Sequence, residues 1–151
     1  MIEVDYGWVK LTEIAKIERC RNDVIYPAGT IYIQVSACAK KSAEKWRILD
    51  KTGELPGKYA AVIPTVPVIP LYLKEALEYS ADEFFCKYIG SNINIQMKLF
   101  DFYTLPFHSN LGEQARVVNA LKPIKDDIEY AEEELRTVGK IKKWFLEKMM
   151  I

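Results

Sequence analysis

EQARVVNALKPIKDDIEYAEEELRTVGKIKKWFLEKM, residues 113–149, is the stretch that decides the architecture of this chain of 151 residues. Its apolar residues recur in alternating steps of three and four, beginning with Leu121, Ile124 and Ile128, which is the spacing of a helix with one apolar seam. At about 1.5 Å per residue, such a helix is roughly 55 Å long. The rest of the chain is too small to bury the whole seam and predicts no second long helix. We therefore expect the partner helix to come from another molecule.

The apolar seam is the predicted dimer interface. Its expected members are Leu121, Ile124, Ile128, Leu135, Val138 and Phe145, with Lys142 as a polar member of the same register. Pro123 and Gly139 lie inside the helix and predict a kink or a locally weak point. Carboxylates come early in the helix and lysines late. This is either a solvated face that matches the helix dipole or a docking face for an antiparallel partner.

The residues before this helix have a different pattern, in which short runs of β-branched and aromatic residues alternate with turns. We therefore predict an α+β fold, with a globular domain over residues 1–108 and a long coiled-coil helix over residues 109–151. The period-two alternation of Thr30–Ser36 predicts a strand with Ile31, Ile33 and Val35 on one face. Further expectations are a helix through residues 11–18, a helix opened by Pro70, a short helix over 82–88, and a last strand over 102–105 that Pro106 ends.

Composition excludes several classes of protein. Half of the residues are hydrophobic, which excludes a disordered chain, and the 21 basic residues equal the 21 acidic ones, which argues against a polybasic binder. The three cysteines form no C-x-x-C pair, and with a single histidine they predict neither a disulfide framework nor a zinc site. The start of the chain resembles no signal peptide, and no apolar run is long enough to span a membrane. We expect a cytoplasmic protein.

Catalytic motifs are missing from the sequence, since it contains no G-x-S-x-G, H-E-x-x-H, P-loop or G-x-G-x-x-G pattern. Cys20 lies between Arg19 and Arg21, whose charges could lower the pKa of its thiol. His108 follows Pro106 and Phe107 in an expected connector, where a hydrogen-bonded or surface histidine is the simpler interpretation. A small enzyme that uses Cys20 or His108 therefore remains only as an alternative.

A binding function suits the local charge better. Bases exceed acids between residues 40 and 58, where polar side chains also lie just upstream, and this combination suits phosphate anchoring and reading of base edges. The predicted DNA contacts are Gln34, Ser36, Lys40, Lys41, Lys45 and Arg47, with Asn92, Asn94 and Gln96 in a second polar loop. An ordinary solvated loop is the alternative interpretation.

Several segments, in their order along the chain, resemble one half of the DNA-specificity (S) subunit of type I restriction–modification systems. They are WVKLTEIA at residues 8–15, GTIYIQ at 29–34, PLYL at 70–73, GSNI at 90–93, LFDF at 99–102, and EQARVVNAL at 113–121 followed by IKDDI at 124–128. The last segment is similar to the "eQ..Iv..L" opening of the conserved helix in that family. The chain departs from the family in its short recognition region and in residues 107–112, which stand where a proline-rich step is usual.

The resemblance implies a target-recognition domain followed by one conserved helix, in a non-catalytic subunit. Such a half-subunit is expected to form a C2 homodimer, to read a split palindromic site in double-stranded DNA, and to direct methyltransferase (modification) and restriction subunits to it. S-adenosylmethionine and magnesium would belong to those subunits, so we expect no cofactor here. The alternative is a decoy or assembly regulator that pairs with restriction–modification subunits without binding DNA.

Overall fold

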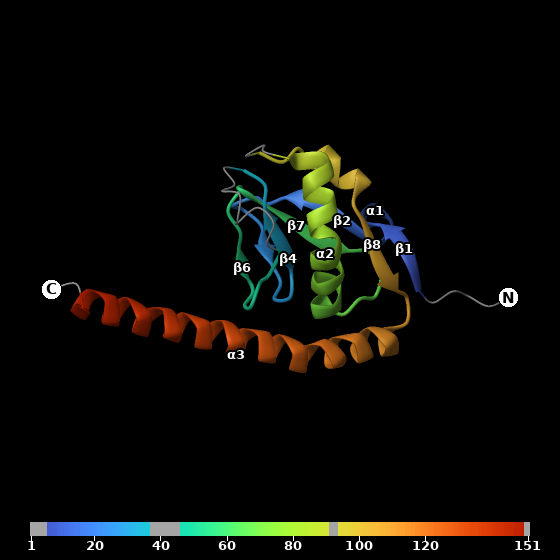
Figure 1. Cartoon of the computed structure of the whole chain (residues 1–151). Helices are drawn as coiled ribbons and strands as arrows, with labels where there is room; N and C mark the ends of the chain where they lie inside the picture. The colour runs from blue at the N-terminus through green and yellow to red at the C-terminus, as the bar shows by residue number, and fades with distance from the viewer. Residues whose placement is uncertain (1–5, 37–45, 91–93, 150–151) are drawn as a thin grey trace. The chain divides into compact units, whose positions relative to one another are not determined.

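The computed structural model describes residues 6–36, 46–90 and 94–149, and the chain divides into two compact units, Met1–Ala115 and Arg116–Ile151. In the first unit, strands β2 (Ala15–Arg19), β7 (Tyr59–Pro64), β4 (Ile31–Gln34) and β5 (Arg47–Ile48) form an antiparallel sheet in that order (Figure 1). A second sheet pairs β1 (Tyr6–Lys10) with β8 (Thr104–His108), and a ribbon pairs β3 (Ile25–Tyr26) with β6 (Gly53–Glu54). The mixed α and β composition confirms the predicted fold class.

Strand β4 shows why the four-stranded sheet is buried on one face. Ile31, Ile33 and Val35 are almost fully buried, whereas Tyr32 and Gln34 between them are partly exposed, as the alternation predicts. Strand β7 is central and has small buried residues, Ala60 and Ala61, one pointing to each face. One face of the sheet therefore meets the main core, and the other carries a smaller cluster of Cys20, Tyr26, Leu55 and Ala61.

Helix α2 (Pro70–Phe84) covers the main core, contacts β8 and β5, and starts with Pro70 in its first turn as expected (Figure 1). It continues directly into a π-helical turn, η1 (Phe85–Ile89), so the separate helix predicted over 82–88 is wrong. The buried side of α2 continues through Ala81, Phe84 and Phe85 without a break, which leaves no place for a turn.

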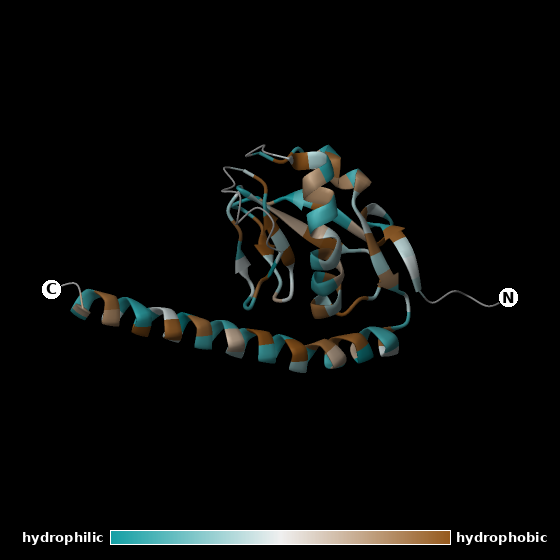
Figure 2. Cartoon of the chain, in the orientation of Figure 1, coloured by the Kyte–Doolittle hydropathy of each residue, from teal (hydrophilic) through white to brown (hydrophobic). Residues whose placement is uncertain are grey.

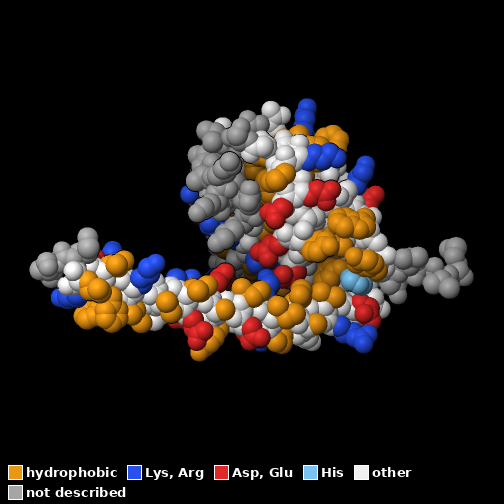
Figure 3. Space-filling model, in the orientation of Figure 1, with side chains coloured by type: hydrophobic (Ala, Val, Ile, Leu, Met, Phe, Trp, Pro, Cys, Tyr) orange, Lys and Arg blue, Asp and Glu red, His pale blue; other side chains and the backbone are white. Residues whose placement is uncertain are grey.

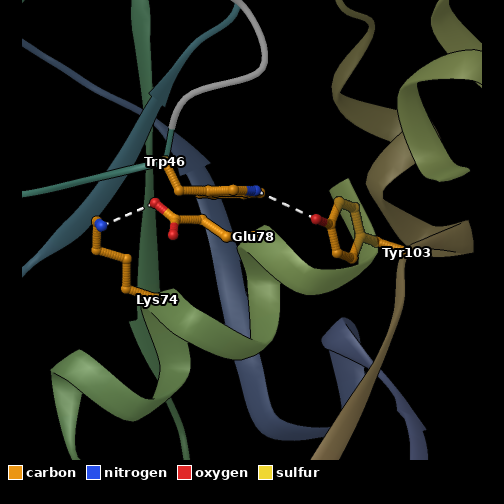
Figure 4. Close-up of polar contacts among 4 residues, drawn as sticks. All are labelled: Trp46, Lys74, Glu78 and Tyr103. Carbon is orange, nitrogen blue, oxygen red and sulfur yellow. Dashed lines mark hydrogen bonds and ion pairs between the residues drawn. The ribbon is translucent and has the colours of Figure 1, made fainter. Parts of the chain in front are cut away.

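An aromatic cluster fills the core beneath α2. The ring of Phe84 lies 4.5 Å from that of Tyr103, and the ring of Trp46 lies 5.7 Å from Tyr103 in an edge-on arrangement. The hydroxyl of Tyr103 donates a hydrogen bond to the carbonyl of Leu77 (2.5 Å). It also accepts one from the indole N–H of Trp46 (3.2 Å), which Figure 4 shows. The hydroxyl of Tyr103 and the indole N–H of Trp46 therefore both have hydrogen-bond partners inside the core. These contacts fix the position of Trp46, the residue that precedes β5.

Two further boundaries differ from the sequence-based expectations. The helix expected over residues 11–18 is one turn, α1 (Leu11–Ile14), because Ala15–Arg19 alternates with period two and pairs with β7. Pro106 does not end the last strand, which runs to His108 after the 3-10 helix η2 (Met97–Phe102). The proline is tolerated because β8 pairs with β1 alone, so its missing N–H leaves no other strand unsatisfied.

Helix α3 (Leu111–Met149) is continuous through Pro123 and Gly139 (Figure 1). Its first turn belongs to the first unit, where the side chain of Asn110 accepts hydrogen bonds from the N–H groups of Gly112 and Glu113. Gln114 is fully buried, accepts a hydrogen bond from the N–H of Ile69 (2.9 Å) and donates one to the carbonyl of His108 (2.7 Å). Apolar and polar residues alternate along the remaining turns (Figure 2).

Candidate nucleic-acid interface

The described DNA-contact candidates lie in three segments. Gln34 and Ser36 are at the end of β4, Arg47 is in β5, and Asn94 and Gln96 flank the buried Ile95. The remaining candidates, Lys40, Lys41, Lys45 and Asn92, lie outside the described residues.

Backbone hydrogen bonds bring two of these segments together at the end of β4. The N–H of Val35 donates to the carbonyl of Lys58 (2.8 Å), and the carbonyl of Val35 accepts from the N–H of Ile95 (2.8 Å). Asn94 and Gln96, on either side of Ile95, are both exposed. Two segments that are about sixty residues apart in sequence are thus joined through their backbones at one end of the sheet.

Arg19 is a member of this region that the sequence did not single out as a DNA contact. Its Nε donates to the carbonyl of Gly57 (2.8 Å), and its Nη2 donates to the hydroxyl of Ser36. Gln34 donates from its side-chain amide to the backbone carbonyl of Ser36 (3.0 Å). Ser36 thus holds Arg19 in place, a role that could be found only once the order β2-β7-β4 is known.

One face of the sheet continues from Gln34 toward β5. Arg47 stands opposite Tyr32 in the pairing of β4 with β5, and Gln34 stands opposite Tyr59 in the pairing of β4 with β7. The rings of Tyr32 and Tyr59 meet edge-on at 5.1 Å, and the ammonium of Lys58 lies 5.2 Å from the Tyr59 ring. Cationic, amide and aromatic groups therefore share one surface. In protein–DNA complexes, side chains of these kinds contact phosphates and bases.

Cys20 is not activated as the sequence suggested. The thiol is buried in the small cluster with Tyr26, and burial raises its pKa, although a hydrogen bond to Tyr26 acts in the opposite direction. The neighbouring Arg19 points to Gly57 and Ser36 instead. The expectation of a lowered pKa is therefore wrong, and the thiol stays in its less reactive protonated form.

His108 is hydrogen-bonded inside the domain, as the simpler interpretation held, although it lies in β8 rather than in a connector. Its Nδ1 is 2.7 Å from the hydroxyl of Tyr72, which also accepts the backbone N–H of His108 (2.7 Å). Burial raises the pKa of Tyr72. Within residues 6–36, 46–90 and 94–149, no group of three or more His, Cys, Asp or Glu side chains is placed to hold a metal ion.

The predicted seam residues lie on α3, where Ile124, Ile128, Leu135, Val138 and Phe145 are exposed, whereas Leu121 is partly buried. Leu135 exposes 71% of its surface. Figure 3 shows hydrophobic side chains along the visible face of this helix. Among the helices in the described part of the chain, none is long and apolar enough to cross a membrane.

Comparison with known proteins relates the fold to one family. No family model and no curated protein matches the sequence, but solved structures do. The S subunit of a type I restriction–modification system from M. genitalium has a TM-score of 0.63 at 16% identity, over 83% of this chain. The HsdS subunit from Thermoanaerobacter tengcongensis gives 0.62 at 16% identity, over 86% of this chain.

A third match comes from a structural study of assembly and conformational transition in the type I restriction–modification system, with a TM-score of 0.65 at 15% identity over 86% of this chain. Each of the three matches covers 40% of the other chain. This chain therefore has the fold of a part of the type I S subunit, which confirms the resemblance found in the sequence at the level of the fold.

Proposed function

We propose that this chain is a non-catalytic DNA-specificity component of a type I restriction–modification system. The observation that carries the proposal is the S-subunit fold, shared over more than four fifths of the chain. The cationic and amide side chains gathered around the end of β4 support it independently, because that surface has the chemistry that DNA recognition needs.

In this proposal the residues divide by chemistry. Arg47 and Lys58 contact phosphates together with Lys40, Lys41 and Lys45, while Gln34, Asn94, Gln96 and Asn92 contact base edges. Ser36 acts through Arg19, to which it is hydrogen-bonded, rather than through a base of its own.

The same proposal includes a homodimer that joins two recognition domains through the α3 seam and reads a split, symmetric site in double-stranded DNA. Methyltransferase and restriction subunits are the proposed partners, and S-adenosylmethionine and magnesium are bound by those subunits. The exposed apolar residues of α3 support dimerisation, and the proposed compartment is the cytoplasm.

The test combines sedimentation with selection from a random-sequence duplex pool at low salt. A dimer that enriches one split, symmetric sequence supports the proposal. A dimer that enriches nothing yet captures a methyltransferase subunit supports the decoy alternative instead.

The DNA surface is tested by deleting positive charges near the four-stranded sheet, with a control deletion away from the end of β4. Arg47→Ala with Lys58→Ala is expected to lower the slope of log K against log salt by about two, because each lost phosphate contact removes about 0.9. Lys51→Ala is the control, since it removes an exposed charge near the start of β4, at the other end of the sheet. An unchanged slope in the double variant would place the DNA surface elsewhere.

A further inference from the structure

The guanidinium of Arg19 is fixed in one orientation at the end of the four-stranded sheet. Arg19 is the last residue of β2, and in the order β2-β7-β4 the start of β7 and the end of β4 lie at the same end of the sheet. Its Nε donates to the carbonyl of Gly57, just before β7, and its Nη2 donates to the hydroxyl of Ser36, just after β4. The side chain is therefore anchored across the ends of three strands, although Arg19 is exposed.

These two hydrogen bonds use one edge of the planar guanidinium and leave its opposite edge available. Nε and Nη2 share one edge of the group, whereas Nη1 and the second N–H of Nη2 form the other edge with two parallel donors. Within the part of the chain that the structure describes, Arg19 makes no further hydrogen bond and no ion pair. Both of its acceptors are uncharged, so the side chain keeps its full positive charge beside the exposed edge.

We propose that Arg19 determines one position of the DNA recognition site, where its available edge donates two hydrogen bonds to N7 and O6 of a guanine in the major groove. This inference rests on the proposed DNA-specificity function and adds a specificity-determining residue and the base that it contacts. A guanidinium can only donate hydrogen bonds, and guanine is the base that presents two neighbouring acceptors in that groove. Adenine and cytosine present an amino donor there, and thymine presents one acceptor beside a methyl group.

The fixed orientation of Arg19 favours a base over a phosphate. Phosphate contacts carry no sequence information, and a cationic side chain without an anchor is sufficient for them. Discrimination between bases depends on the direction of the donors, and a side chain that is already held loses little freedom when it binds. The exposed amides of Asn94 and Gln96 lie near the same end of the sheet, because the N–H of Ile95 donates to the carbonyl of Val35. Amide and guanidinium side chains are the groups that most specifically contact adenine and guanine.

Selection from a random-sequence duplex pool tests which position of the site depends on Arg19. In Arg19→Ala we expect one guanine position to lose its preference, with a roughly 5- to 150-fold loss of discrimination there, while the other positions stay as they are. Arg19→Lys keeps the charge but has no fork of donors, so it is expected to lose the same preference. Arg21→Ala is the control, because it removes the same kind of side chain just after the end of β2 and should leave the selected sequence unchanged.

A modified base locates the contact at a single atom of the DNA. 7-Deazaguanine still pairs with cytosine but lacks the N7 acceptor. At the position identified with Arg19→Ala, we expect it to weaken binding of the unaltered chain at least about fivefold, because a hydrogen bond to a charged group is lost. The same base should leave binding of Arg19→Ala unchanged, since that variant has already lost the hydrogen bond. An equal loss in both chains would show that another group contacts this guanine, and it would overturn the inference.

Ser36 is a positioning residue in this proposal, because its hydroxyl holds the guanidinium that contacts the base. Its own backbone is held in turn, since the side-chain amide of Gln34 donates to the carbonyl of Ser36 (3.0 Å). Ser36→Ala is therefore expected to lose part of the guanine preference, whereas Ser36→Thr keeps a hydroxyl acceptor and should retain it. An unchanged preference in Ser36→Ala would show that this hydroxyl does not orient Arg19, and it would overturn the positioning role.

The salt dependence of binding separates a base contact from a phosphate contact. A base contact leaves the slope of log K against log salt nearly unchanged in Arg19→Ala. A phosphate contact would weaken binding to all sequences by the same factor and lower that slope by about 0.9. Such a result, or a selected site in which no guanine depends on Arg19, overturns the inference and leaves the DNA-specificity function standing. An unaltered chain that enriches no sequence at all overturns that function, and the role of Arg19 with it.

Discussion

Tyr103→Phe removes one oxygen atom from the middle of the aromatic core. The side chain is fully buried, and its hydroxyl accepts a hydrogen bond from Trp46 (Figure 4). The same hydroxyl donates a hydrogen bond to the backbone of α2 at Leu77. Without the oxygen, the indole N–H of Trp46, a residue that is only 2% exposed, has lost its acceptor. Leaving such a buried donor unpaired costs about 1–3 kcal/mol, and the lost bond to Leu77 adds about 1 kcal/mol.

The expected loss in the free energy of unfolding is therefore roughly 2–4 kcal/mol, a large part of the ~5–15 kcal/mol that stabilises a typical domain. Urea titration followed by far-ultraviolet circular dichroism measures it. Tyr79→Phe is the control, because that ring is largely exposed. A loss of less than about 0.5 kcal/mol in Tyr103→Phe would refute the reasoning, since it would mean that the indole needs no partner inside the core.

Three other outcomes follow from the same structure. Leu135→Asp is expected to raise the dimer dissociation constant at least about a hundredfold by placing an unpaired charge in the apolar seam, whereas Thr137→Asp, which adds the same charge on the outer face, leaves sedimentation unchanged. Iodoacetamide should modify the exposed Cys86 well before the buried Cys20, as peptide mapping would show; equal rates would contradict the burial of Cys20. Burial raises the pKa of Tyr103 above its ordinary value of 10.0, so the unfolded chain ionises first and the free energy of unfolding falls as pH rises above that value. Tyr103→Phe should flatten this alkaline decline in urea titrations from pH 8 to 11, and an equally steep decline in the variant would assign it to other groups.

The sequence predicted correctly those elements in which the apolar residues keep one regular spacing from end to end. The alternation of Ile31, Ile33 and Val35 identified β4, and the steps of three and four identified α3. Errors arose where two periods meet, as at Ala15, where helical spacing and strand alternation fit the same residues. Pro106 was misjudged because its effect depends on whether β8 has one neighbour or two, which local sequence does not contain.

The candidate site was predictable in composition but not in arrangement. Gln34 and Arg47 could be chosen from residue type, and the sheet does place them on one face. Asn94 and Gln96 lie near the end of β4 because the N–H of Ile95 donates to the carbonyl of Val35. This hydrogen bond joins segments that are distant in sequence, and neither segment contains a pattern that predicts its partner. The same is true of Arg19, whose partner depends on which strands are neighbours.

The pairing of β1 with β8 has a consequence for the order of events during synthesis. These strands are the first and the last of the domain, so β1 has no strand to pair with until almost the whole domain has left the ribosome. Contacts that close so long a loop form late and slow the folding of the chain. Helix α3 follows β8 in the chain, so its exposed apolar residues leave the ribosome only once β1 and β8 can pair. The topology thus delays the exposure of these apolar residues to neighbouring nascent chains until the domain can fold.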